Sequence, residues 1–404
     1  MKINYTRWSW IFLAASLPLA WMFLQRSSRR SPVPVVRVAT FDVAMRRDAP
    51  GLLLEELRSG RSVQARAVAE IVQRNAVDVL LICGFDRDGD GSAVAVFADD
   101  YLAVGQGGQH GIEFPYRYCG AVNAGEPSGI DLDGDGSVDG PGDSWGPGAF
   151  AGQGGMAVLS RHPILADRVR TFRELHWDAM PGALRPDDCR DDETWRQLRL
   201  SSRSHWDVPI GLGPVSDGRV LHLLCSQPTS PMLEGEVDRN GRRNHDEVRF
   251  WCDYLTPERA TWITDDDGGR GGLDPAASFV LAGDLGCDPV DGAARRDALL
   301  ELLGHERVRD PAPRSPGAEL AANQQWGSNS DQRGAVVHDT ADLDDTPGTG
   351  PGNLRVDYVL PSRDLGEHGA LVFWPLPHEA GADLVSASDH RLVWVDVGLP
   401  AAAR

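Results

Sequence analysis

The sequence is short of positive charge. Its 404 residues include 40 lysines and arginines against 59 aspartates and glutamates, which gives a formal net charge of −19 at pH 7. A protein that binds nucleic acid without sequence preference must neutralise many phosphates with basic side chains. The charge balance therefore argues against general nucleic-acid binding, but it leaves open a small anionic ligand held by a local metal ion.

Cysteine is also scarce. The chain has six cysteines, and no two of them form a Cys-x-x-Cys pair. Structural zinc sites usually show such pairs at fixed spacing, so the sequence argues against one. Internal repeats are absent as well, and the pairing of any disulfide cannot be read from the spacing.

The N-terminus carries an apolar run from Trp8 to Leu24, with Lys2 and Arg7 before it. The run is long enough for a short transmembrane helix. No small-x-small cleavage site follows, which favours an uncleaved export anchor; a cleaved signal peptide and a buried amphipathic helix are the alternatives. We expect residues 1–34 to be an anchor or signal segment with a linker. Residues 35–400 are then a folded domain, membrane-anchored or exported, outside the cytoplasm.

Strand and helix patterns alternate along this domain. Apolar runs predict strands at 35–43, 77–82, 156–160, 220–226, 279–285, 355–361, 370–374 and 391–397. Apolar residues at helical spacing predict helices around 65–72 and 248–255, and Ser62 and Asp291 are candidate N-caps, the latter for a helix running to Leu303. Insertions rich in Gly, Pro and Asp lie near 105–155, 178–218 and 305–352. The pattern indicates an α/β fold with two sheets packed face to face and helices outside.

Polar side chains gather where these strands begin or end. They are Gln227, Asp284, Asp357, Asp389 and His390, and Asn244 stands near the start of a predicted helix. Strand ends are where open α/β sheets place ligands and catalytic groups. Carboxylates and a histidine in such positions are typical of a metal-assisted hydrolase.

Eight short motifs follow one another along the chain: VATFDV, VDVLLICGFD, GMAVLSRHPI, LLCSQPTSP, RNGRRNHDEVRFW, GDLGCDPVDG, RVDYVLPS and SDHRLVWVDV. Their order resembles the endonuclease/exonuclease/phosphatase superfamily. The resemblance spans about residues 35–398 and is nearest to an extracytoplasmic bacterial branch with long insertions. It implies a four-layer α/β sandwich and a phosphoesterase that uses a divalent cation, commonly Mg²⁺ or else Mn²⁺.

The resemblance also assigns roles to single residues. Asp284 stands where the family has the aspartate that orients a water molecule. Asp389 and His390 match the terminal Ser-Asp-His motif, whose histidine hydrogen-bonds the phosphate, and Asp357 matches the aspartate of the preceding strand. These four are the expected catalytic residues, and a phosphorylated small molecule is the expected partner.

Four positions depart from the family pattern. The first strand ends in Asp42 instead of asparagine, and the second delivers Gly84 where the family has its metal-binding glutamate. Gln227 replaces a histidine, and Gly286 replaces the asparagine of the Gly-Asp-x-Asn motif. Gln227 is still an expected substrate contact, together with Asn244.

Two hypotheses follow from these departures. In the first, catalysis is weakened or lost because a hard-cation site lacks its carboxylate, and the protein acts as a binding or scaffold module at the membrane. In the second, the protein is an active phosphoesterase with a rearranged metal site that uses Asp42, Asp284, Asp389 and His390. Asp86, two residues past Gly84, is a further candidate ligand.

The first hypothesis makes a prediction about back-substitution. Gly84→Glu, Gln227→His and Gly286→Asn together should raise the rate, because they complete one site. The strand at Val79 to Ile82 is rigid, so a glutamate at position 84 should project into the site without remodelling the backbone.

A second acidic pattern lies in an insertion. The stretch IDLDGDGSVDGPGD contains Asp131, Asp133, Asp135, Asp139 and Asp143. The first three have the spacing that opens an EF-hand-type calcium loop. Position twelve of the loop is Gly142 instead of the closing glutamate, and Asp139 or Asp143 would have to substitute. We expect Ca²⁺ at residues 131–143, with a solvated acidic loop as the alternative.

Overall fold

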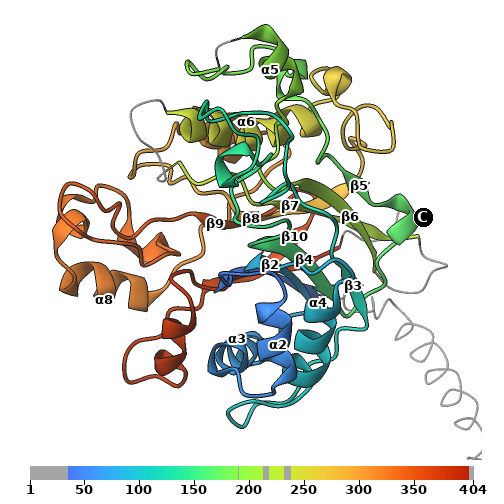
Figure 1. Ribbon diagram of the computed structural model, residues 1–404. Helices are drawn as coiled ribbons and strands as arrows, with labels where there is room; N and C mark the ends of the chain where they lie inside the picture. The colour runs from blue at the N-terminus through green and yellow to red at the C-terminus, as the bar shows by residue number, and fades with distance from the viewer. Residues whose placement is uncertain (1–34, 190, 213–217, 232–237, 400–404) are drawn as a thin grey trace, which may run out of the picture. The chain divides into compact units, whose positions relative to one another are not determined.

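The computed structural model describes residues 35–189, 191–212, 218–231 and 238–399, and its described part contains two β-sheets (Figure 1). The first sheet has the order β10-β11-β1-β2-β4-β3 and the second β5-β6-β7-β8-β9. The strands of the first sheet are β1 (Val35–Met45), β2 (Val79–Phe85), β3 (Tyr116–Tyr118), β4 (Gly155–Ser160), β10 (Gly366–Val372) and β11 (Val393–Gly398). Those of the second are β5 (Arg170–Thr171), β6 (His205–Gly211), β7 (Val220–Ser226), β8 (Ser278–Asp284) and β9 (Asp357–Pro361).

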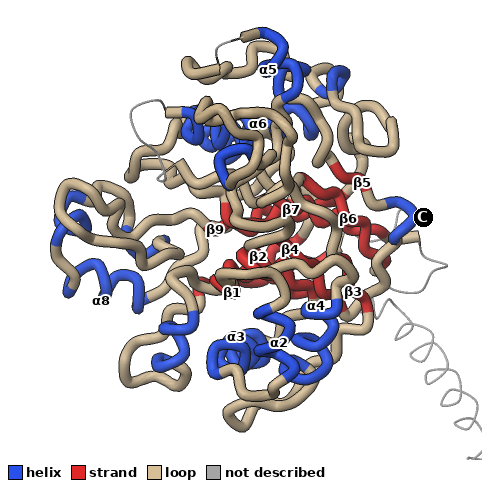
Figure 2. Tube along the Cα trace, in the orientation of Figure 1, coloured by secondary structure: helices blue, strands red, loops and turns tan. Residues whose placement is uncertain are grey.

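Helices cover the outer face of each sheet (Figure 2). The longer ones are α2 (Leu52–Arg58), α3 (Val63–Arg74), α6 (Arg239–Leu255), α7 (Asp297–Gly304) and α8 (Pro316–Gln324), and two short ones are α4 (Ser92–Val96) and α5 (Asp192–Gln197). Side chains of α2 and α3 pack with outward residues of β1 and β2, and those of α6 and α7 pack on β7 and β8. A third apolar cluster fills the space between the sheets. The predicted four-layer α/β sandwich is confirmed.

Local sequence signals explain much of this arrangement. The hydroxyl of Ser62 accepts a hydrogen bond from the backbone N–H of Ala65 and caps α3, as expected. Asp291 does not cap α7, which begins at Asp297; its carboxylate instead accepts hydrogen bonds from the backbone N–H groups of Arg333 and Gly334. That contact joins it to residues more than 40 positions away, which local spacing cannot reveal.

The insertions contain structure that the sequence pattern did not predict. Strand β6 lies within 178–218 and pairs with β7 along its whole length. Among the described residues, no helix is both long enough and apolar enough to cross a membrane. The apolar run at 8–24 lies outside the described residues, so the expected anchor stays a prediction.

Candidate functional site

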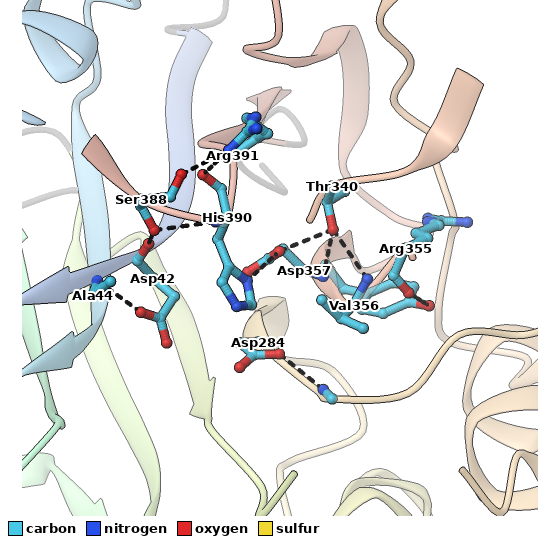
Figure 3. Close-up of polar contacts among 12 residues, drawn as sticks. Asp42, Ala44, Asp284, Thr340, Arg355, Val356, Asp357, Ser388, His390 and Arg391 are labelled. Carbon is cyan, nitrogen blue, oxygen red and sulfur yellow. Dashed lines mark hydrogen bonds and ion pairs between the residues drawn. The ribbon is translucent and has the colours of Figure 1, made fainter. Parts of the chain in front are cut away.

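The strand ends of both sheets converge at one edge of the sandwich. Parallel pairing of β1 with β2 places Asp42 beside Cys83, next to Gly84. Antiparallel pairing of β8 with β9 places Asp284 beside Asp357. The structure therefore brings together side chains that lie far apart in the sequence, and Figure 3 shows Asp42, Asp284 and His390 around a common space.

His390 and Asp357 form an ion pair at the centre of this site. The imidazole Nδ1 lies 2.9 Å from Oδ2 of Asp357, which is 1% exposed. Burial disfavours the charged imidazole, but the carboxylates of Asp357, Asp284 and Asp42 outweigh it and raise the pKa of His390 to about 10. The histidine is therefore a cation at neutral pH, able to donate from Nε2 to an anion.

A residue of the 305–352 insertion supports this pair. The hydroxyl of Thr340 donates to Asp357 Oδ2 at 2.9 Å and accepts from the backbone N–H groups of Val356 and Asp357 (Figure 3). Thr340 is fully buried, and Ala341 next to it bridges to His390. The insertion is therefore built into the site and helps to hold the carboxylate that charges the histidine.

Asp284 faces the same space from the end of β8. Its Oδ1 accepts a hydrogen bond of 2.9 Å from the backbone N–H of Gly286. Burial, together with the negative charges of Asp357 and Asp42, raises the pKa of Asp284 to about 6, against the opposing effect of His390. A carboxylate with this pKa can accept a proton near neutral pH.

Asp42 occupies the place that a side chain on residue 84 would need. A Cβ atom built on Gly84 would lie 2.0 Å from Asp42 Oδ1, and Gly84 has φ +65°, in the region that favours glycine. The Asp42 carboxylate accepts hydrogen bonds from the backbone N–H of Ala44, from Arg46 at 2.7 Å and from Gln227 Nε2 at 3.0 Å. Burial opposes its ionisation, but Arg46, His390 and the Ala44 N–H hold its pKa below the usual value.

The prediction that a glutamate at position 84 projects freely into the site is therefore wrong. The strand is rigid, but its backbone turns into the left-handed region at Gly84 and the space is filled by Asp42. The changes at 42, 84 and 227 form one packed unit. The glycine makes room for the aspartate, and the glutamine donates to it.

The other expected substrate contacts serve the scaffold. Asn244 is fully buried, and its Nδ2 donates to the carbonyl oxygens of Thr229 and Leu285 at 2.9 Å each. It thus fixes the two loops that follow β7 and β8. A Cβ on Gly286, which has φ +61°, would lie 3.2 Å from Asn244 Nδ2, so a side chain there would press on this contact.

Asp389 and Asp86 do not belong to the close group of Asp42, Asp284 and His390. The side chain of Asp389 is exposed, and Asp357, not Asp389, is hydrogen-bonded to the imidazole of His390. Asp86 accepts from the backbone N–H groups of Arg47 and Gly154, so its two oxygens hold β1 and β4 together.

Comparison with known proteins gives the family of the chain. The model of the Endonuclease/Exonuclease/phosphatase family matches residues 40–390. The chain belongs to this family. No curated protein sequence matches it. An endonuclease/exonuclease/phosphatase from Beutenbergia cavernae is similar in structure, with 19% identity, a TM-score of 0.50 and coverage of 91% of this chain and 72% of that one. A family protein from Leptotrichia buccalis shares 14% identity over 90% of this chain and all of that one, with a TM-score of 0.44.

Members of the endonuclease/exonuclease/phosphatase family typically depend on a divalent metal, so we asked whether these residues fit one. Ligand atoms of Asp42, Asp284 and His390 lie within 4.8 Å of one another. However, a metal ligand must be deprotonated, and His390 is charged with its Nδ1 on Asp357. The Asp42 oxygens already accept three hydrogen bonds, one of them from a cationic arginine. A cation bound to this group would therefore have to displace Arg46 from the Asp42 carboxylate.

Two arginines of the site were missed in the sequence. Arg46 pairs with Asp42, and its side chain is 43% exposed. Arg203 comes from the 178–218 insertion, and its charge acts on Asp42 and Asp284. Arg46 follows Asp42 by only four residues, so its contact with Asp42 could have been predicted from the sequence. No feature of the sequence around Arg203 indicates that it reaches the site.

The acidic insertion loop also gathers carboxylates, and the third member of the group is Asp143, one of the two expected substitutes, instead of Asp135. Oxygens of Asp131, Asp133 and Asp143 lie within 4.8 Å of one another. Asp135 and Asp139 are outside this group, and Asp135 Oδ1 accepts from the backbone N–H of Ser137. Asp143 is 1% exposed. It replaces Asp135 because the chain turns back at the end of the loop.

Proposed function

We propose that this domain binds a phosphate ester at the site and that metal-dependent hydrolysis there is weakened or lost. The observation that carries the proposal is the position of the Asp42 carboxylate. It fills the space beside Gly84 and forms an ion pair with Arg46. The site keeps three cations, Arg46, Arg203 and His390, whose charges all act on Asp42.

These cations suit a phosphate group. Arginine presents a planar set of donors that matches phosphate oxygens, and Arg46 is exposed enough to turn towards a ligand. His390 offers Nε2, because Asp357 holds Nδ1. A phosphorylated small molecule is the partner we favour. Binding or scaffolding outside the cytoplasm, with the N-terminal segment as membrane anchor, completes this proposal.

A specific observation favours a second candidate, an active phosphoesterase. The carboxylates of Asp42 and Asp284 are close enough to share a cation, and one or two carboxylates with water and substrate oxygens suffice for Mg²⁺. Arg46 would have to leave Asp42 for this to occur. Asp389 and His390 would then act on the phosphate.

Assays on the full-length protein separate the two candidates. We expect hydrolysis of p-nitrophenyl phosphate and its bis ester, with Mg²⁺ or Mn²⁺, to be no faster than in the Asp284→Asn/His390→Gln variant. Turnover that needs the cation and disappears in Asp42→Ala would establish the second candidate instead.

We further propose that the 131–143 loop holds a structural Ca²⁺. The three clustered carboxylates are oxygen donors of the kind Ca²⁺ prefers. The carboxylate of Asp131 also accepts hydrogen bonds from the backbone N–H groups of Gly134 and Gly136, and that of Asp143 accepts one from Leu132, so the loop already turns around these groups.

Calorimetry tests this loop directly. Calcium should bind to the unmodified protein, and Asp133→Ala should abolish the heat of binding because it removes one of three close carboxylates. Asp139→Asn is the matched control, since Asp139 lies in the loop but outside the cluster. Absence of binding, or equal loss in the control, would contradict the proposal.

A further inference from the structure

A cavity of about 800 Å³ lies on the outer side of the second sheet, away from the site described above. Its polar lining comes from neighbouring strands: Arg170 on β5, Asp207 on β6 and His222 on β7. His222 stands near the beginning of β7, whereas Gln227 follows the end of that strand. The cavity and the catalytic site are therefore at opposite ends of the same strands.

A buried network organises one wall of the cavity. Asp207 is 2% exposed, and its two oxygens are both in use, one 2.7 Å from His222 Nδ1 and one accepting a 2.7 Å hydrogen bond from Tyr254. Arg170 donates to the Tyr254 hydroxyl at 3.2 Å and is itself fixed by Asp265. The carboxylate of Asp207 therefore sets the orientation of the His222 imidazole. Carboxylates often hold metal-binding and catalytic histidines in this way, by bonding the other ring nitrogen.

This arrangement leaves two residues of the lining with side-chain nitrogen atoms that no described residue pairs with. With Nδ1 on Asp207, the imidazole has Nε2 free, and no hydrogen bond among the described residues takes it up. Arg168, which also lines the cavity, is exposed and makes no side-chain hydrogen bond or ion pair with the part of the chain that the structure describes. Arg170 adds charge, although its own donors are occupied by Asp265, Tyr254 and backbone carbonyls.

Two acidic side chains also belong to the lining, and the carboxylate of each is hydrogen-bonded within the protein. The Asp207 carboxylate is turned towards His222 and Tyr254. Asp274, the other acid of the lining, accepts a hydrogen bond from the backbone N–H of Ala276. An arginine and an imidazole nitrogen without partners in the described protein, in the lining of a cavity wide enough for a small molecule, suit a phosphate group.

We infer that this cavity is a second anion-binding site, which takes the phosphate group of a small molecule on His222 Nε2 and Arg168. The site is independent of the proposed function, because none of its residues contacts Asp42, Asp284 or His390. A phosphorylated ligand bound here would occupy the sheet end opposite the catalytic one.

Calorimetry with inorganic phosphate tests the inference on full-length protein that carries His390→Gln, so that phosphate at the catalytic site is suppressed. Binding should persist in this variant. Adding Arg168→Gln or His222→Asn should weaken it by about tenfold or more, because the first change removes a charge-assisted donor and the second removes the Nε2 donor. Asparagine can still donate to Asp207 but lacks the Nε2 position.

Arg66→Gln is the control, since Arg66 is exposed on α3 and lines a different part of the surface. The inference is overturned if phosphate does not bind to folded His390→Gln protein, or, since that change is itself destabilising, if Arg168→Gln leaves phosphate binding to the otherwise unmodified protein unchanged. It is also overturned if Arg66→Gln weakens binding as much as Arg168→Gln, which would indicate a general charge effect. Arg168 is exposed, so its replacement should leave the fold intact even if the His222 variant does not fold.

Discussion

Gly84→Glu is expected to destabilise the protein by about 4 kcal/mol or more and to restore no metal site. A non-glycine residue at φ +65° costs about 1–2 kcal/mol. The new side chain would also displace the buried Asp42 carboxylate from Arg46 and Gln227, and disrupting a buried ion pair costs about 3–5 kcal/mol. Urea unfolding of the variant and the unmodified protein measures the difference.

Gly60→Glu separates the cost of backbone strain from the cost of displacing the Asp42 carboxylate. Gly60 has φ +66°, almost the same as Gly84, but nothing lies within 4 Å of a Cβ built there. It should show the backbone cost alone. The double variant Asp42→Gly/Gly84→Glu should lose less stability than the sum of its single changes, because the overlap is gone. Equal losses for Gly84→Glu and Gly60→Glu would refute the steric pairing of Asp42 with Gly84.

His390→Gln should cost about 3–5 kcal/mol, since it leaves the Asp357 carboxylate, 1% exposed, without its cation. The same pair predicts a pH dependence of the unmodified protein. The pKa of His390 is raised in the folded state, from 6.5 to about 10. The stabilisation is therefore fully present below about pH 6.5 and is lost as the pH rises through about 10.

Unfolding free energies measured between pH 6 and 10 check that stability falls as the pH rises. Asp357→Asn is the matched variant, because it removes the charge that raises the pKa of His390 while keeping the shape of the side chain. The stability of Asp357→Asn should fall less steeply than that of the unmodified protein over this range. A decline of equal slope in both proteins would show that the pair is not responsible.

Sequence patterns predicted the fold well because its signals are local or ordered along the chain. Buried strands such as β2 are visible in the sequence as apolar runs. The start of α3 is also predictable, because Ser62 is a typical N-cap residue and bonds only three residues ahead. The order of strand-end motifs then indicated which polar side chains would meet. Parallel and antiparallel register brings Asp284 to Asp357 and Asp42 to the neighbourhood of Gly84.

The meaning of the glycine was not readable from the sequence. Gly84 by itself looks like a loss of a metal ligand. Only the backbone angle and the position of the Asp42 oxygen show that the glycine is required by the aspartate. The sequence did not predict Arg203 and Thr340 as site residues for a different reason. Both belong to long insertions, and their contacts with the site depend on tertiary structure alone.

Binding of Mn²⁺, followed by electron paramagnetic resonance with the acidic loop saturated by Ca²⁺, tests the central claim most directly. That claim is that Arg46 and Gln227, instead of a metal ion, satisfy the Asp42 carboxylate beside Gly84. The account predicts the same Mn²⁺ signal for the unmodified protein and for Asp284→Asn, with no tightly bound ion at this site. A bound Mn²⁺ that is lost in Asp284→Asn and in Asp42→Asn would contradict it.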